Sequence, residues 1–204
     1  MASPFVPGSA TTLDELRAAA HECKGCDLYR DATQVVFGAG PANARVVLVG
    51  EQPGDIEDRR GLPFVGPAGK VLDRAIVEAG LDRAGAYVTN TVKHFKFTSA
   101  GPGKRRIHQT PDRIEIEACR PWLQAEFALL SPEIVVALGA TAAKALLGPS
   151  FRVTKSRGVL MPWSDGASQI LATIHPSAVL RSDNRDEAYA GLVNDLTVVS
   201  GALS

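Results

Sequence analysis

Four short apolar segments rich in Val, Ile and Ala recur along the chain, and polar or glycine-rich residues follow each of them. Such segments are typical of strands in a parallel sheet that is covered on both faces. The pattern predicts strands over residues 45–50, 86–92, 133–139 and 169–174. We therefore expect a central sheet of four strands.

Between these segments, apolar positions recur at the three- and four-residue spacing of helices. Helices are predicted over residues 67–80, from about 110 to 130, and over 140–147 and 185–199. Thr110, Pro111 and Asp112 look like a helix start, and Pro121 predicts a kink or break. The stretch 95–110 is predicted to be an irregular loop, and a loop of this length is uncommon without a function. The alternation predicts an α/β fold with three layers, α/β/α, around a mostly parallel four-stranded sheet.

The composition fits one domain over residues 1–204, because 45% of the residues are hydrophobic and 22% are charged. Residues 1–12 are expected to be flexible. The N-terminal residues contain no basic region followed by an apolar one, so no signal peptide is expected. The most apolar stretch, 134–143, is about half the ~20 residues that a membrane-spanning helix needs, so we expect no membrane partner.

The net charge is zero, with 22 basic and 22 acidic residues, which argues against a uniformly basic binder of nucleic acid. The charge is unevenly distributed. Residues 84–111 contain five basic side chains and no acidic one, namely Lys93, Lys96, Lys104, Arg105 and Arg106. A local basic patch can bind a polyanion because screening limits each charge to short range. A solvated surface loop explains the same composition, and composition alone does not separate the two.

Polar residues follow the predicted strands at the sheet edge where parallel α/β proteins bind ligands. The residues at this edge are Glu51, Gln52, Pro53, Gly54, Asp55, Thr89, Asn90, His175, Pro176 and Ser177. Three of the four histidines, His94, His108 and His175, lie in or beside these loops. A single histidine is usually structural, but their shared location favours a functional site.

The cysteines form a second candidate site. Cys23 and Cys26 form a C-x2-C pair, and Cys119 lies far downstream. The C-x2-C spacing presents two thiolates to one metal, and His94 is a candidate for the fourth ligand. A structural zinc and an iron–sulfur cluster both fit this ligand set, and an incidental or redox pair is the alternative.

Four motifs, in this order, resemble the iron–sulfur uracil-DNA glycosylases of family 4. They are GEQPGD at 50–55, LPFVGPAG at 62–69, YVTN at 87–90 and HPS at 175–177, and the resemblance covers nearly the whole chain. Two departures point to the UdgX type. His94 stands where family 4 usually has a cysteine, and KRRIH at 104–108 is an insertion typical of that type. The resemblance implies the uracil-DNA glycosylase fold and a bacterial, cytoplasmic protein that acts at the nucleoid.

The resemblance also implies how uracil is read once its nucleotide is flipped from the stack. The Asn90 amide would donate to uracil O4 and accept from N3–H, whereas cytosine presents the opposite pattern. Phe64 would stack on the base. His175 would hydrogen-bond uracil O2 and stabilise the departing anion. The remaining substrate-binding residues implied are Gln52, Pro53, Gly54, Arg106 and Ser177.

For the chemical step, the resemblance implies that a carboxylate, Glu51 or next Asp55, stabilises the cationic sugar after the glycosidic bond breaks. In the UdgX type, the residue that matches His108 then attacks C1′ in place of water. A histidine is nucleophilic only when neutral, and the adjacent basic residues would disfavour its protonated form. Glu51 would orient the ring or take its proton. No obvious acid would expel the bonded nitrogen, so a single turnover is expected.

The resemblance makes the metal centre a [4Fe-4S] cluster held by Cys23, Cys26, His94 and Cys119. The expected partner is uracil-containing DNA, preferentially single-stranded, with uracil as product and the protein as a monomer. Two alternatives stay open. One is an ordinary hydrolytic glycosylase that turns over. The other is a non-catalytic, metal-containing nucleic-acid-binding module, whose acids between 51 and 58 would hold Mg²⁺.

Overall fold

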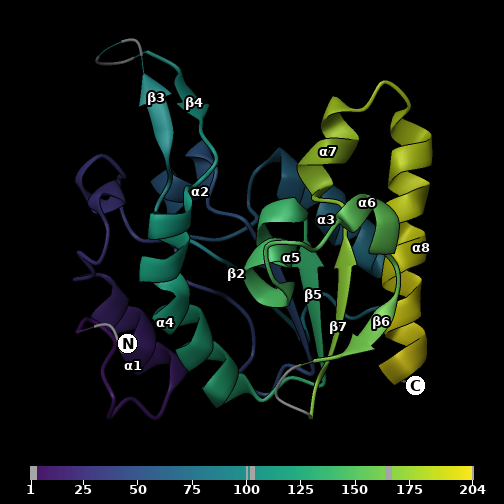
Figure 1. The fold of residues 1–204 in the computed structure, drawn as a ribbon, viewed down its shortest axis with the longest axis horizontal. Coiled ribbons are helices and arrows are strands. Elements are labelled where there is room, and N and C mark those ends of the chain that lie inside the picture. Colours follow the sequence, from purple (N-terminus) through teal and green to yellow (C-terminus); the bar gives the residue numbers. More distant parts are fainter. Residues whose placement is uncertain (1–3, 100, 102–103, 164–166, 204) are drawn as a thin grey trace.

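The computed structural model describes residues 4–99, 101, 104–163 and 167–203, and its core is one five-stranded sheet in the order β2-β1-β5-β7-β6 (Figure 1). Four strands run parallel: β1 (Val46–Gly50), β2 (Ala86–Asn90), β5 (Ile134–Leu138) and β7 (Gln169–Thr173). The predicted α/β fold is confirmed, but the predicted number of strands is wrong. The fifth strand, β6 (Leu160–Pro162), pairs antiparallel with β7. Three residues are too few for a sequence pattern, and a proline is tolerated at a sheet edge.

Helices cover both faces of the sheet (Figure 1). They are α1 (Leu13–Ala20), α2 (Asp55–Arg60), α3 (Pro67–Glu78), α4 (Arg113–Leu130), α5 (Ala140–Leu147), α6 (Val153–Ser156), α7 (Pro176–Arg181) and α8 (Arg185–Leu203), with a 3₁₀ turn, η1, at Asp27–Arg30. Alternate strand residues point to opposite faces. Leu48 therefore packs with α3 and α8, whereas Val47 and Val49 pack with α4 and α5. The predicted three layers are confirmed.

Helix α4 begins at Arg113, two residues after the predicted first helical residue Pro111, and does not end at its proline. Asp112 is the N-cap, with a capping box to Glu115. The helix continues through Pro121 to Leu130, so the expected break is absent. Pro121 removes one hydrogen bond to the carbonyl of Glu117, and this residue is exposed, so water can supply the missing donor.

The segment predicted to be an irregular loop contains a β-hairpin. β3 (Phe97–Ser99) pairs antiparallel with β4 (Arg106–His108), and Phe97 lies opposite His108. The rings of Phe95 and Phe97 stack with centroids 5.1 Å apart. Three-residue strands joined by a glycine-containing connection lack a readable alternation, which explains why the hairpin was not predicted. The hairpin projects beyond the carboxyl ends of the sheet strands (Figure 1).

The N-terminal segment belongs to a third packed cluster. Phe5, Val6 and Ala10 pack against buried residues that include Cys119 and Trp122. Residues 1–3 of the segment predicted to be flexible lie outside the described residues. Within the part of the chain that the structure describes, no helix has the length and apolar character to cross a membrane.

Candidate active site

A cavity of about 810 Å³ lies at the carboxyl end of the sheet, where the polar residues after the strands were predicted to meet. Eight predicted site residues line it: Glu51, Gln52, Gly54, Phe64, Asn90, His108, His175 and Ser177. These residues come from the end of β2, from the loops after β1 and β7, from the loop between α2 and α3, from the start of α7 and from the hairpin. Asp55, Pro53 and Arg106 do not line it. Thr141 and Glu57 do, and the sequence reasoning did not include them as catalytic or substrate-binding residues.

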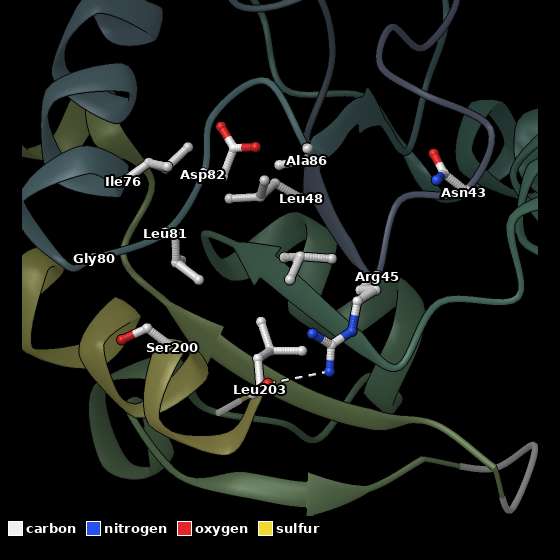
Figure 2. Close-up of a pocket in the computed structure, with 12 residues that line it drawn as sticks. Asn43, Arg45, Leu48, Ile76, Gly80, Leu81, Asp82, Ala86, Ser200 and Leu203 are labelled. Carbon is white, nitrogen blue, oxygen red and sulfur yellow. Dashed lines mark hydrogen bonds between the residues drawn. The ribbon is translucent and has the colours of Figure 1, made fainter.

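A smaller cavity of about 420 Å³ lies at the opposite end, beside the start of β1 and β2 (Figure 2). Its floor is apolar, and its charged groups are already engaged within the protein. Arg45 donates to both carboxylate oxygens of Glu133, at 2.5 and 2.9 Å, and to the Leu203 carbonyl at 3.1 Å. The ligand edge of a parallel sheet is its carboxyl end, so the larger cavity is the candidate active site.

His175 is held as a neutral ring with a defined tautomer. The Ser177 backbone N–H donates to Nδ1 of His175 at 3.2 Å, and the Ser177 hydroxyl lies 2.7 Å from the same nitrogen. Arg181 donates to that hydroxyl at 3.0 Å. Burial, followed by the effects of Arg181 and His108, lowers the pKa of His175 to about 4. Since Nδ1 accepts, the ring proton of the neutral form resides on Nε2.

His108, Glu51 and Thr141 come together from three elements. Nε2 of His108, on β4, lies 3.4 Å from Oε1 of Glu51, which follows β1. The second oxygen of Glu51 accepts a hydrogen bond from the Thr141 hydroxyl at the start of α5. His108 is half-exposed and Glu51 largely buried. The predicted pairing of His108 with Glu51 therefore has a geometric basis. Thr141 follows a strand end, so the rule that located Glu51 applies to it as well.

Asn90 and Phe64 share one wall of the cavity because two glycines leave room for them. A Cβ on Gly50 would lie 2.4 Å from Oδ1 of Asn90 and 2.7 Å from Cζ of Phe64. Phe64 adopts a left-handed backbone with φ +56°, which is uncommon for a bulky residue. A Cβ on Gly69 would lie 1.8 Å from the Phe64 carbonyl oxygen. Strain of this kind is often found at ligand sites.

A buried ion pair lies behind Asn90. Nζ of Lys93 lies 2.5 Å from Oε2 of Glu126 and 2.8 Å from the Asn90 carbonyl oxygen. Glu126 also accepts from the hydroxyls of Tyr87 and Thr89. Both charged side chains are fully buried. Thr89 therefore faces this network and not the cavity, since neighbouring strand residues point to opposite faces.

Arg106 forms ion pairs with other side chains of the protein. Its guanidinium pairs with Asp55, lies 2.6 Å from Oδ2 of Asp58, and sits 4.8 Å from the Phe97 ring centre. Burial raises the pKa of Asp55, but hydrogen bonds from Arg59 and Arg106 outweigh this effect, and the pKa is lowered overall. Arg106 and Asp55 thus fasten the hairpin to α2, instead of facing the cavity.

Gln52 also holds the hairpin. Its amide donates to the carbonyls of Lys96 and Gln109, at 3.1 and 3.0 Å, and accepts from the Lys96 N–H at 3.0 Å. Glu57 is buried, and its Oε1 accepts from the Gly66 N–H at 2.7 Å. Both side chains line the cavity while bonded to the loops around it. They shape the site through these loops.

The three cysteines lie close to one another. Cys23 packs against the buried cluster that contains Cys119, and a Cβ on Gly25 would lie 3.6 Å from Cys23 Sγ and 3.8 Å from the Ala118 carbonyl oxygen. Trp122 Nε1 donates to Cys23 Sγ at 3.1 Å, and the Lys93 N–H donates to Cys119 Sγ at 3.3 Å. Burial raises the pKa of the Cys119 thiol to about 12.

The fourth predicted ligand, His94, is buried, and burial lowers its pKa although Asp58 opposes the shift. Among residues 4–99, 101, 104–163 and 167–203, no group of three or more His, Cys, Asp and Glu side chains is arranged to hold a metal ion. The structure therefore brings the cysteines near each other without assembling the predicted four-ligand site.

Comparisons with known proteins agree with this geometry. Residues 37–197 match the model of the uracil DNA glycosylase superfamily. A type-4 uracil-DNA glycosylase of Thermotoga maritima is 37% identical over 166 residues, which are 81% of each chain. The type-4 enzyme of Sulfurisphaera tokodaii is 36% identical over 180 residues, 85% of this chain and 78% of the relative. A Pyrobaculum aerophilum type-4 enzyme is 35% identical over 175 residues, 83% and 85% of the two chains.

Proposed function

The chain belongs to the uracil-DNA glycosylase superfamily, and on that premise we propose that it excises uracil from single-stranded DNA and then bonds covalently to the abasic site through His108. The names of its type-4 relatives support the excision step. The observation that carries the covalent step is the 3.4 Å contact between Nε2 of His108 and Oε1 of Glu51 at the cavity. An imidazole beside a carboxylate is the arrangement of an activated nucleophile.

Uracil recognition rests on the wall formed by Asn90 and Phe64. The Asn90 amide can donate to O4 and accept from N3–H, which cytosine cannot satisfy. The Phe64 ring offers a stacking surface for a flipped base. Behind this wall, Lys93 donates to the backbone carbonyl of Asn90 and so fixes the main chain from which the side-chain amide projects.

The leaving group is stabilised by His175. With Nδ1 bonded to Ser177, the Nε2–H of the neutral ring is the available donor toward the cavity. A donor aimed at uracil O2 strengthens its bond as negative charge develops on the departing base. The base then leaves with the electron pair of its glycosidic bond.

The covalent step uses Glu51 as the base for His108. Glu51 takes the Nε2 proton, which leaves a neutral ring with a free electron pair on that nitrogen. The bond from C1′ to N1 of uracil breaks, and Nε2 then bonds to C1′ of the resulting sugar cation. The uracil anion takes a proton from solvent. The bonded ring first carries the positive charge. Once its Nδ1 proton passes to solvent, the ring is a neutral N-substituted imidazole that would have to leave C1′ as an anion, so the reaction ends after one turnover.

The hydrolytic alternative uses the same cavity, with water attacking C1′, and the type-4 names of the relatives favour it. A denaturing gel separates the two. The protein is incubated with uracil-containing single-stranded DNA and then heated in SDS. A shifted band that reaches one equivalent supports the adduct. Free abasic DNA beyond one equivalent supports hydrolysis. If no reaction occurs, both the covalent and the hydrolytic mechanisms are contradicted, and the non-catalytic binding module is the reading that stands.

His108→Ser should lose the shifted band, and a persisting band would remove His108 as the nucleophile. His21→Ser is a matched control, because His21 is exposed at the end of α1 and distant in the sequence from every cavity residue. It should form the adduct like the wild type.

We also propose that Cys23, Cys26 and Cys119, with His94 as fourth ligand, hold a [4Fe-4S] cluster. The donor types fit, because cysteine thiolates and an imidazole are ligands of iron–sulfur clusters, and the N–H groups of Lys93 and Trp122 already donate to the sulfurs of Cys119 and Cys23. Such a cluster would cross-link the N-terminal segment to α4. Purified protein should be brown and contain iron and sulfide, and stoichiometric zinc in a colourless protein would contradict the proposal.

A further inference from the structure

Each oxygen of the Glu51 carboxylate has a different neighbour. One faces Nε2 of His108 at 3.4 Å, and the other accepts the hydrogen bond of the Thr141 hydroxyl. Glu51 sits in a loop, and its side chain has several rotatable bonds. His108 lies on the projecting hairpin and is half-exposed, so it is a poor anchor for Glu51. Of the two neighbours, Thr141 is the one that can fix the carboxylate.

The Thr141 hydroxyl is held rigidly by the start of α5. Thr141 is the second residue of this helix, which is anchored by the buried Ala142 and Ala143. The preceding Gly139 has φ +90°, and its N–H donates to the Thr173 carbonyl at 2.9 Å. A Cβ on Gly139 would lie 2.9 Å from Cβ of His175. The turn before Thr141 is thus packed closely against the end of β7 and against His175.

We infer that Thr141 is a positioning residue, whose hydroxyl holds one oxygen of Glu51 so that the other is directed at His108. This role rests on the covalent mechanism proposed above. Under this inference, the Thr141 hydroxyl acts through Glu51 to favour attack by His108 over attack by water. An oriented carboxylate takes the His108 proton promptly, whereas a rotating one leaves the sugar cation exposed to water.

Removing the hydroxyl should change how the sugar cation partitions. In Thr141→Val, the side chain keeps its shape but Glu51 loses its fixed donor. Asn90, Phe64 and His175 keep their contacts, so uracil is still released. A hydrogen bond to a charged group is strong enough for the ratio of adduct to free abasic DNA to fall about tenfold or more. Thr141→Ser retains the hydroxyl and should restore most of the wild-type ratio.

The measurement is a single-turnover time course with uracil-containing single-stranded DNA, in which uracil release, adduct and free abasic DNA are quantified together. Thr197→Val is the matched control. Thr197 is exposed on α8, and its hydroxyl donates to the Val193 carbonyl of the same helix. This variant should partition like the wild type. Thr141→Ala, with a favourable helix residue, replaces the valine variant if that protein does not fold.

A wild-type ratio in a folded Thr141→Val or Thr141→Ala protein would overturn the role of Thr141 while leaving the covalent mechanism intact. Loss of folding in both variants would also overturn it, because a positioning role predicts a folded protein. A wild-type protein that forms no adduct would overturn the proposed function itself. A lowered ratio in Thr141→Val, restored in Thr141→Ser, supports the inference.

Discussion

The backbone N–H of Ser177 donates to Nδ1 of His175 across 3.2 Å, and this contact determines which ring nitrogen carries the proton. Both residues belong to one short segment, since His175 is the N-cap of α7 and accepts the hydrogen bond that a cap accepts. A single turn therefore orients the ring, keeps it neutral and directs Nε2–H away from the helix.

The depressed pKa of His175, about 4 compared with the ordinary 6.5, makes the folded protein sensitive to acid. Between these values the unfolded chain binds a proton that the folded protein does not, so stability is full above pH 6.5 and falls toward pH 4. The free energy of unfolding is measured with urea at pH 7 and at pH 4.5. Between these pH values it should fall by about 2 kcal/mol more in the wild type than in His175→Gln. Equal losses in the two proteins would contradict a neutral His175.

Asn90→Asp should impair uracil excision selectively. The carboxylate has no N–H to donate to O4, while the side chain keeps its size and the buried network behind it stays intact. Loss of one arm of a two-bond base contact predicts a decrease in excision rate of about tenfold to a hundredfold. Single-turnover rates measure this effect. Asn43→Asp, at the smaller cavity, is the control and should excise uracil at the wild-type rate.

Lys93→Met should destabilise the protein strongly, because it leaves the fully buried Glu126 carboxylate without its partner. The expected loss in free energy of unfolding is about 3–5 kcal/mol, measured by urea titration. Adding Glu126→Leu should recover part of it. Arg120→Met breaks an exposed pair with Glu117 on the same helix and should cost less than about 1 kcal/mol. Equal effects of Lys93→Met and Arg120→Met would show that burial does not matter here.

The salt dependence of DNA affinity tests how many basic side chains of the stretch 84–111 are free to bind DNA. Lys93, Lys96 and Arg106 are committed to ion pairs, whereas Lys104 and Arg105 are exposed. Removing the last two as a double alanine variant should reduce the slope of log affinity against log salt by about 1.4 for single-stranded DNA. Binding to a non-cleavable uracil analogue measures the slope. Adduct that has already formed should survive high salt in both proteins.

An unchanged slope in the double variant would mean that the hairpin does not contact phosphate. Initial capture would then depend on other cations beside the cavity. Arg181 is the first candidate, since it lines the cavity and is exposed.

The parallel strands were predictable from sequence because their apolar runs are continuous and buried on both faces. The same rule located Glu51, Asn90 and His175, since each lies at or just after a strand end at one edge of the sheet. The N-cap position of His175 and the hairpin were not predictable in this way. Each depends on a few residues with no periodicity of their own.

The ion-pair partners of the charged side chains were the least predictable part of the site. Arg106 lies in a basic run, yet it pairs with Asp55 and Asp58, which are about fifty positions earlier in the chain. Lys93 likewise pairs with Glu126, which is 33 positions later in the chain. Pairing between distant segments appears only once the chain has folded, so a local count of basic residues overestimated the surface available to DNA.

The covalent link to His108 is the central claim, and mass spectrometry of the protein after reaction with uracil-containing DNA tests it most directly. Nuclease and protease digestion leaves a short sugar-phosphate remnant on whichever residue attacked C1′. The account predicts that the remnant is found on the peptide containing His108, that it lacks uracil, and that it is absent from His108→Ser. A remnant on another residue, or unmodified protein beside free abasic DNA, would contradict it.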